Sequence, residues 1–130
     1  MKNAIIIATV VTAMAGFAHA QDAAKGEKLF KKCASCHQVG PDAKNKTGPI
    51  LTGVIGRPAG TIQGFKYSKS MAAAGAAGLV WSSEKVVDYI ADPTKYLRKL
   101  LDDPKAKAKM TFKLKKEDER RDVVAYLGKL

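Results

Sequence analysis

The spacing of apolar and polar positions predicts an all-helical protein. Small and apolar residues fall close to one helical stripe from Ala23 to His37, and lysines occupy the other side. Near the C-terminus, apolar residues recur at i, i+3, i+4 and i+7 behind the acidic run Glu117-Asp118-Glu119, which suits the positive end of a helix. This closing amphipathic helix extends to Leu130. No segment alternates like a β-strand over any useful length.

The middle of the chain predicts short helices joined by long loops. Gly40–Gly64 contains six glycines and three prolines, so we expect an irregular loop there. A short helix over Tyr67–Ala74 follows, and Gly75 and Gly78 should break it.

Two further helices have clear start signals. Ser82 or Ser83 can cap a helix that runs through Ile90. Asp92-Pro93 then supplies a new N-cap followed by proline at the first helical position, so the next helix covers roughly Thr94–Leu101.

Residues 1–20 have the pattern of a secretory signal peptide. Lys2 is followed by an uncharged stretch of thirteen residues, from Ala4 to Gly16, and then by the A-x-A sequence Ala18-His19-Ala20. A transmembrane anchor is the alternative, but it needs about 20 apolar residues. We therefore predict cleavage after Ala20, export to the periplasm, and one domain over residues 21–130.

Composition narrows the partners and the chemistry. The 130 residues allow one domain, and the net charge is +11; losing Lys2 lowers it by one, to +10. Such a protein suits acidic partners, with at most peripheral contact with anionic lipid. We expect no nucleic acid partner, because no recognition motif is present and exported proteins rarely meet DNA. Two Cys and two His exclude a multi-bridge disulfide scaffold and a four-ligand Cys/His zinc site in the exported domain, since His19 leaves with the signal.

The chemistry is carried by Cys33-Ala34-Ser35-Cys36-His37, a C-x-x-C-H sequence typical of covalent haem attachment. Positions i, i+3 and i+4 share a helix face, so both thiols and the imidazole can address one flat ligand. The thiols can add to the haem vinyl groups, and His37 then reaches the iron. A thioredoxin-like dithiol is the alternative, but no βαβ pattern surrounds the motif. We predict one covalently bound haem c per chain.

The second axial ligand must come from another residue type. His37 is the only histidine of residues 21–130, so methionine is the next candidate. Met71 lies in Ser70–Ala74, where a packing role suffices to explain it. Met110 lies between two basic segments and outside any apolar stripe, which favours Met110 but leaves Met71 open.

Over residues 21–130 the chain resembles the class I c-type cytochromes, and within them it is most similar to the bacterial cytochromes c2. The matching pieces keep the family's order: Gly26, Phe30, Cys33–His37, Thr47-Gly48-Pro49, Gly56-Arg57, Gly64–Tyr67, Trp81, Tyr89, Asp92-Pro93, Lys109–Phe112 and Ala125–Leu127. The resemblance implies the cytochrome c fold, with short helices and long loops wrapped around one covalent haem.

The resemblance also implies roles for single residues. Met110 would be the second axial ligand, and the Pro49 carbonyl would support His37. Three residues would surround the haem propionates: Arg57, Tyr67 and Trp81. Tyr89 would lie near the methionine sulfur. Ordinary core packing explains the aromatic residues equally well when the residues are considered alone.

The helix crossing and two departures from the family pattern add further expectations. Gly26 and Tyr126 would mark the crossing of the first and last helices. Ile50 stands where relatives usually have asparagine, which puts a loop hydrogen bond in doubt. The segment Leu97–Ala108 is longer than in mitochondrial relatives, so the loop that presents Met110 is expected to have its own geometry.

Six lysines match or neighbour family positions that ring an exposed haem edge and dock acidic partners: Lys32, Lys46, Lys95, Lys109, Lys113 and Lys116. For any one of them, a solvated basic face is the alternative.

The function that the resemblance implies is one-electron transfer rather than enzymatic catalysis. The protein would be a monomeric periplasmic carrier that takes electrons from the cytochrome bc1 complex in transient complexes. Its acceptor would be a photosynthetic reaction centre or a terminal cytochrome oxidase. A haem enzyme or gas-binding cytochrome with an open or labile sixth iron position is the alternative.

Overall fold

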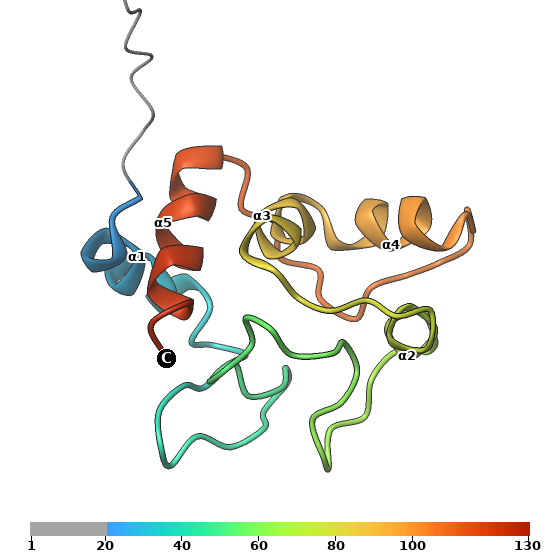
Figure 1. The fold of residues 1–130 in the computed structure, drawn as a ribbon, viewed down its shortest axis with the longest axis horizontal. Coiled ribbons are helices and arrows are strands. Elements are labelled where there is room, and N and C mark those ends of the chain that lie inside the picture. Colours follow the sequence, from blue (N-terminus) through green and yellow to red (C-terminus); the bar gives the residue numbers. More distant parts are fainter. Residues whose placement is uncertain (1–20) are drawn as a thin grey trace, which may run out of the picture.

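The computed structural model describes residues 21–130, so the predicted signal peptide lies outside the described residues. Helices and loops alternate along this part of the chain (Figure 1), and the helices are α1 (Ala23–Leu29), the 3₁₀ helix η1 (Phe30–Lys32), α2 (Lys69–Ala76), α3 (Ser83–Ala91), α4 (Pro93–Leu101) and α5 (Glu117–Leu127). Within residues 21–130, β pairing is limited to one isolated bridge between Pro58 and Val80. The all-α prediction is confirmed.

The first helix is shorter than predicted. It ends at Leu29, η1 follows, and Cys33–Cys36 lie in turns. Beyond that end the loop bonds to two carbonyls of this segment: Lys46 Nζ donates to Ala34 O at 3.2 Å and Gly48 N to Cys36 O at 2.8 Å. The His37 amide still donates to Cys33 O at 2.9 Å, so the C-x-x-C-H motif keeps one helix-like turn.

Helix α2 differs from its prediction at both ends. It begins after Ser68, whose hydroxyl accepts a hydrogen bond from the Met71 amide, and it continues through Gly75 to Ala76. A Cβ at Gly75 would collide with the carbonyl group of Ala59. Gly75 is therefore a site of close backbone packing rather than a helix breaker, and Gly78, at φ 93°, follows the true end.

The start signals of the next two helices are confirmed. The Ser82 hydroxyl accepts from the Lys85 amide at 3.3 Å, and the Asp92 carboxylate accepts from the Lys95 amide at 3.0 Å. Pro93 is the first residue of α4, as expected.

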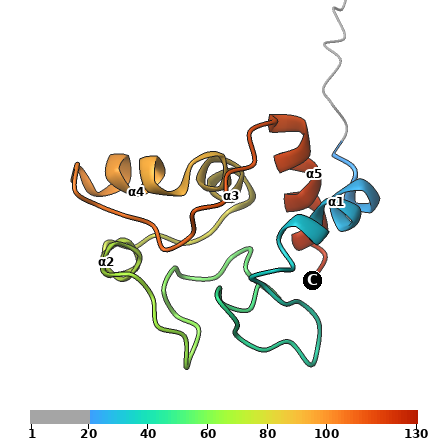
Figure 2. The same cartoon turned by 180° about the vertical axis from the view of Figure 1, so that it is seen from behind.

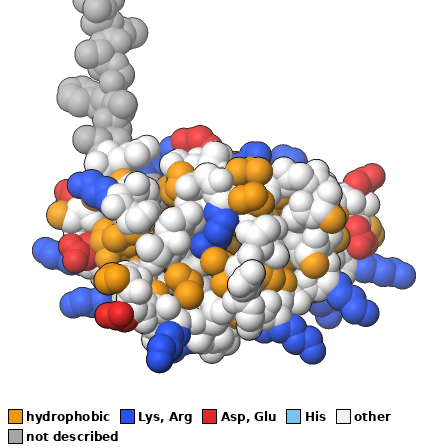
Figure 3. Space-filling view, turned by 60° about the horizontal axis from the view of Figure 1, so that its bottom comes forward, with side chains coloured by type: hydrophobic (Ala, Val, Ile, Leu, Met, Phe, Trp, Pro, Cys, Tyr) orange, Lys and Arg blue, Asp and Glu red, His pale blue; other side chains and the backbone are white. Residues whose placement is uncertain are grey.

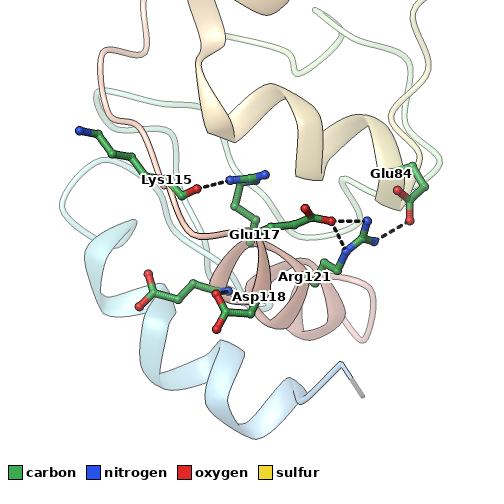
Figure 4. A network of polar contacts seen from close by, with 7 residues as sticks. Glu84, Lys115, Glu117, Asp118 and Arg121 are labelled. Atoms are coloured by element: carbon green, nitrogen blue, oxygen red, sulfur yellow. Dashed lines mark hydrogen bonds and ion pairs between the residues drawn. The ribbon is translucent and has the colours of Figure 1, made fainter. Parts of the chain in front are cut away.

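Helix α5 begins at the predicted acidic run but ends at Leu127, before the predicted Leu130. Its Arg121 joins two helices, because the guanidinium pairs with Glu117 of α5 at 2.8 Å and with Glu84 of α3 at 2.9 Å (Figure 4). These contacts link α5 to the first turn of α3.

Helices α1 and α5 lie side by side at one end of the molecule, and α2 and α4 lie at the other (Figures 1 and 2). Gly26 is buried at the α1–α5 crossing, where an added Cβ would overlap the Asp122 carbonyl and come within 3.0 Å of the Tyr126 Cβ. The Phe30 and Tyr126 rings pack at 5.7 Å between centroids. The predicted crossing of the first and last helices at Gly26 and Tyr126 is confirmed.

We expect Gly26→Ala to lower the free energy of unfolding by about 1–3 kcal/mol, because the methyl group must push α1 away from α5. Thermal unfolding of the haem-loaded protein measures this. Gly128→Ala is the matched control: its Cβ would lie 3.5 Å from the nearest atom, at a negative φ of −66°, so it should be nearly neutral. Equal losses from both variants would contradict the close packing at Gly26.

Candidate haem site

A cavity of about 250 Å³ opens between the helices and the long loops. It gathers the haem residues that the sequence predicts, and both methionines of residues 21–130: Cys33, Cys36, His37, Pro49, Arg57, Tyr67, Met71, Trp81, Tyr89 and Met110. Core side chains such as Val54, Val86 and Leu127 also line it. The cavity is therefore continuous with the hydrophobic core and has a mainly apolar wall.

Both thiols line this cavity. Cys33 and Cys36 are partly buried and not bonded to each other. Burial raises the pKa of the Cys33 thiol, whereas reactive dithiols depend on a lowered thiol pKa. This environment suits thioether attachment better than dithiol chemistry.

The imidazole of His37 is held in one orientation. Its Nδ1 lies 2.7 Å from the Pro49 carbonyl oxygen, and the ring packs so closely on Gly48 that a Cβ there would overlap it. Burial lowers the pKa of His37, so the ring is neutral near pH 7. A neutral ring that donates from Nδ1 to a carbonyl presents the lone pair of Nε2 as a metal ligand.

The two methionines differ in their surroundings. Met71 lies on α2 and packs against the hydrophobic core. Met110 lines the same cavity from a segment without regular secondary structure and is not part of that core cluster. Core packing therefore accounts for Met71 and leaves Met110 without a packing role.

Arg57 and Tyr67 reach the cavity from the long loop. The Arg57 guanidinium donates to Ile50 O at 3.0 Å, and the Ile62 amide donates to the Tyr67 hydroxyl at 3.1 Å. Burial lowers the pKa of Arg57, and such a desolvated guanidinium, still charged, favours an anionic group nearby. The carboxylates of haem are groups of that kind.

Trp81 and Tyr89 belong to an aromatic cluster with Tyr96. The ring centroids of Trp81 and Tyr89 are 4.9 Å apart, and those of Tyr89 and Tyr96 are 5.6 Å apart. Burial raises the pKa of Tyr89, which lines the cavity, so its phenol stays protonated and keeps its hydrogen-bond donor. Tyr96 was not singled out from the sequence, because an aromatic on an amphipathic helix signals only core.

The donor set fits a covalently attached haem. The cavity is lined by two thiols, which suit the haem vinyl groups, and by a neutral imidazole and a thioether sulfur, which suit the iron. A desolvated cation suits the propionates, and the apolar wall suits the ring faces.

Comparison with known proteins agrees with this fit. The family described as Cytochrome c matches residues 23–130. The chain belongs to the cytochrome c family. Cytochrome c2 iso-2 of Rhodospirillum centenum is 57% identical over 112 residues, covering 82% of this chain and 93% of the relative. A cytochrome c2 of Rhodopseudomonas palustris is 54% identical, and the match covers 85% of this chain and 99% of the relative.

Solved structures show the same relationship. A cytochrome c2 from Rhodospirillum centenum superimposes with a TM-score of 0.80 at 55% identity, covering 83% of this chain and 97% of that one. Ferric cytochrome c-550 from Paracoccus versutus superimposes with a TM-score of 0.78 at 42% identity. The match covers 85% of this chain and 98% of that one. This cytochrome therefore has the class I fold, resembles the bacterial cytochromes c2, and carries a covalently bound haem c through Cys33 and Cys36. No helix within residues 21–130 is long and apolar enough to span a membrane.

The loop at Ile50 of this cytochrome keeps a hydrogen bond despite the missing asparagine. The Ile50 amide donates to Asn45 Oδ1 at 3.0 Å, and Asn45 Nδ2 donates to Gln63 O at 3.1 Å. Sequence reasoning did not find Asn45; its only signal is an asparagine in a glycine-rich loop, where such side chains often bond to the backbone.

The six predicted docking lysines are not equivalent. Lys32 and Lys109 line the cavity, and Lys46 bonds to the carbonyl of Ala34 within the C-x-x-C-H motif. Lys113 pairs with Asp92 at 2.9 Å, which offsets its charge locally. Lys95, Lys113 and Lys116 do not line the cavity. In Figure 3, most basic side chains project from the rim of the face, with acidic side chains among them, and apolar patches lie on the face itself.

Proposed function

We propose that this cytochrome is a soluble periplasmic carrier of single electrons, whose haem iron is ligated by His37 and Met110. The observation that carries this proposal is the shared cavity: an imidazole fixed by Pro49 and a methionine without a packing role line it together. With His37 and Met110 both bound to the iron, no coordination position would be left for a substrate. This accords with an electron-carrying cytochrome rather than an enzyme.

The bound haem supplies a centre that gains and loses one electron. The chain's own residues hold and tune it. Cys33 and Cys36 attach it, and Pro49 keeps the His37 ring in position. The soft thioether of Met110 favours a higher reduction potential than a harder ligand would. The mainly apolar wall offers a surface against which the ring faces of the haem would pack.

The ferric absorption spectrum tests the ligation. Low-spin haem with the weak long-wavelength band of an iron–thioether bond would support the proposal. High-spin ferric haem would overturn it in favour of an enzyme or gas-binding cytochrome with an open sixth position.

The electron donor in this proposal is the cytochrome bc1 complex, and the acceptor is a photosynthetic reaction centre or a terminal cytochrome oxidase. The resemblance to cytochromes c2 supports this assignment, together with the basic charge of the domain, which suits acidic partners. Electron-transfer kinetics with purified reaction centres and with purified oxidase decide between the two acceptors. Failure to reduce either one at a useful rate would contradict the assignment.

Association with the partner is expected to be fast, weak and strongly dependent on salt. The charge of +10 falls by two with the ionised propionates and rises by one with the ferric centre, which leaves about +9. This net charge steers the protein to an acidic surface. Because the Debye length is about 10 Å at 0.1 M ionic strength, added salt should slow the bimolecular step but barely change transfer within the complex. Flash or stopped-flow kinetics against ionic strength measure both steps.

Charge reversal locates the docking surface. We expect Lys109→Glu and Lys95→Glu to slow association several-fold more than Lys129→Glu, which follows α5 near the C-terminus. Equal effects from all three variants would mean that net charge, rather than a ring of lysines, controls the encounter.

A further inference from the structure

Met110 lies in a stretch of chain whose two ends are anchored. Residues 109–113 form no helix. On the C-terminal side, Leu114 is buried and its amide donates to the Ile90 carbonyl at 2.9 Å. On the N-terminal side, Ala106 is only 2% exposed. The position of the Met110 sulfur therefore depends on how firmly these ends are held.

Three side chains from two helices hold the N-terminal end, and we call them the platform: Ser70 of α2 with Thr94 and Arg98 of α4. Each bonds to a different one of three consecutive residues. Arg98 Nε donates to Ala106 O at 3.0 Å. The Lys107 amide donates to the Ser70 hydroxyl at 3.0 Å, and the Ala108 amide donates to the Thr94 hydroxyl at 3.1 Å.

The three platform side chains lie on helices that pack against each other. Thr94 and Arg98 are four residues apart on α4 and so share one face. Helix α4 packs against α2, which carries Ser70. The bonded residues 106–108 end two positions before Met110.

We propose that the platform positions Met110 for the haem iron by keeping residues 106–108 in a single conformation. This inference rests on the proposed His37 and Met110 ligation. Ser70, Thr94 and Arg98 are positioning residues, since they act through the backbone that precedes Met110. Loss of one platform bond raises the fraction of molecules in which Met110 has left the iron. An external ligand binds only that fraction, so its apparent affinity rises in proportion.

Imidazole titration of the ferric, haem-loaded protein tests the platform. We expect Ser70→Ala and Thr94→Val each to tighten apparent imidazole binding about fivefold, the effect of one hydrogen bond. The thioether absorption band should weaken at lower imidazole concentrations than in the wild type. Thr94→Ser, which keeps the hydroxyl, should bind imidazole like the wild type.

Matched variants separate positioning from general stability. Thr61→Val removes a hydroxyl that donates to the Pro58 carbonyl at 2.7 Å, outside the platform, and should leave imidazole affinity unchanged. If Thr94→Val and Ser70→Ala lower thermal stability but bind imidazole like the wild type, the platform is only structural and the inference is wrong.

Met110→Ala distinguishes this failure from failure of the proposed function. A thioether band in the wild type that Met110→Ala abolishes shows that the ligation stands, and unchanged platform variants then overturn the inference alone. A wild type without this band, or one whose band survives Met110→Ala, overturns the proposed ligation and the inference together.

Discussion

We expect Met110→Ala to open the sixth position of the iron while the haem stays attached, since attachment depends on Cys33 and Cys36. The reduction potential should fall by on the order of 0.1 V, a small part of the roughly 0.8 V range that axial ligands span. Carbon monoxide should bind the ferrous protein, which the wild type should resist. Redox titration and ferrous absorption spectra with and without carbon monoxide measure these two changes.

Met71→Ala is the matched control, because Met71 lines the same cavity but packs against the core. Its free energy of unfolding should fall. The loss is about 2–5 kcal/mol for a fully buried methionine and is expected to be smaller for this partly buried one. Its spectrum should remain that of the wild type. The reverse outcome, in which Met71→Ala opens the iron and Met110→Ala does not, would exchange the roles of the two residues.

The second large effect concerns folding, which should depend on haem. We expect Cys33→Ala with Cys36→Ala to give a largely unfolded export product. At about 24 cal/mol per Å³, a 250 Å³ cavity that haem does not fill costs up to about 6 kcal/mol. The whole free energy of unfolding of a domain of this size is only about 5–15 kcal/mol. Circular dichroism of the exported protein, with haem absorbance measured in parallel, reports the outcome.

Ser35→Ala is the control for this double variant, because it changes the same motif without removing a thiol. It should be exported, loaded with haem and helical. A double cysteine variant with wild-type helix content and a cooperative thermal transition would show that the helices do not need haem to form the core.

Short sequence motifs predicted those features of this cytochrome that depend only on residues close together in the chain. Asp92 followed by Pro93 placed the start of α4 correctly, because a cap bonds to a backbone amide only three residues away. The C-x-x-C-H motif identified the haem attachment site in the same way, since both thiols and the imidazole lie within five consecutive residues. The Gly26–Tyr126 crossing was predictable only through resemblance to a family.

The helix predictions were wrong where backbone from a distant part of the chain contacts the predicted helix. The first helix ends at Leu29, and residues of the following loop bond to the carbonyls of Ala34 and Cys36, which lie in the predicted helix but form turns. Gly75 lies inside α2 because the Ala59 carbonyl approaches its backbone. Periodicity and propensity contain no information on either contact, since the partners are more than ten residues away.

Residue order alone therefore specified the helical class, the starts of α3, α4 and α5, and the haem-attaching motif, all of which depend on neighbours within one or two helical turns. The packed fold was needed to bring Met110 into the cavity that His37 lines, to separate it from the core-packed Met71, and to place Ser70 beside Lys107. Those arrangements join residues far apart in the chain, and only the burial of a common core brings such residues together.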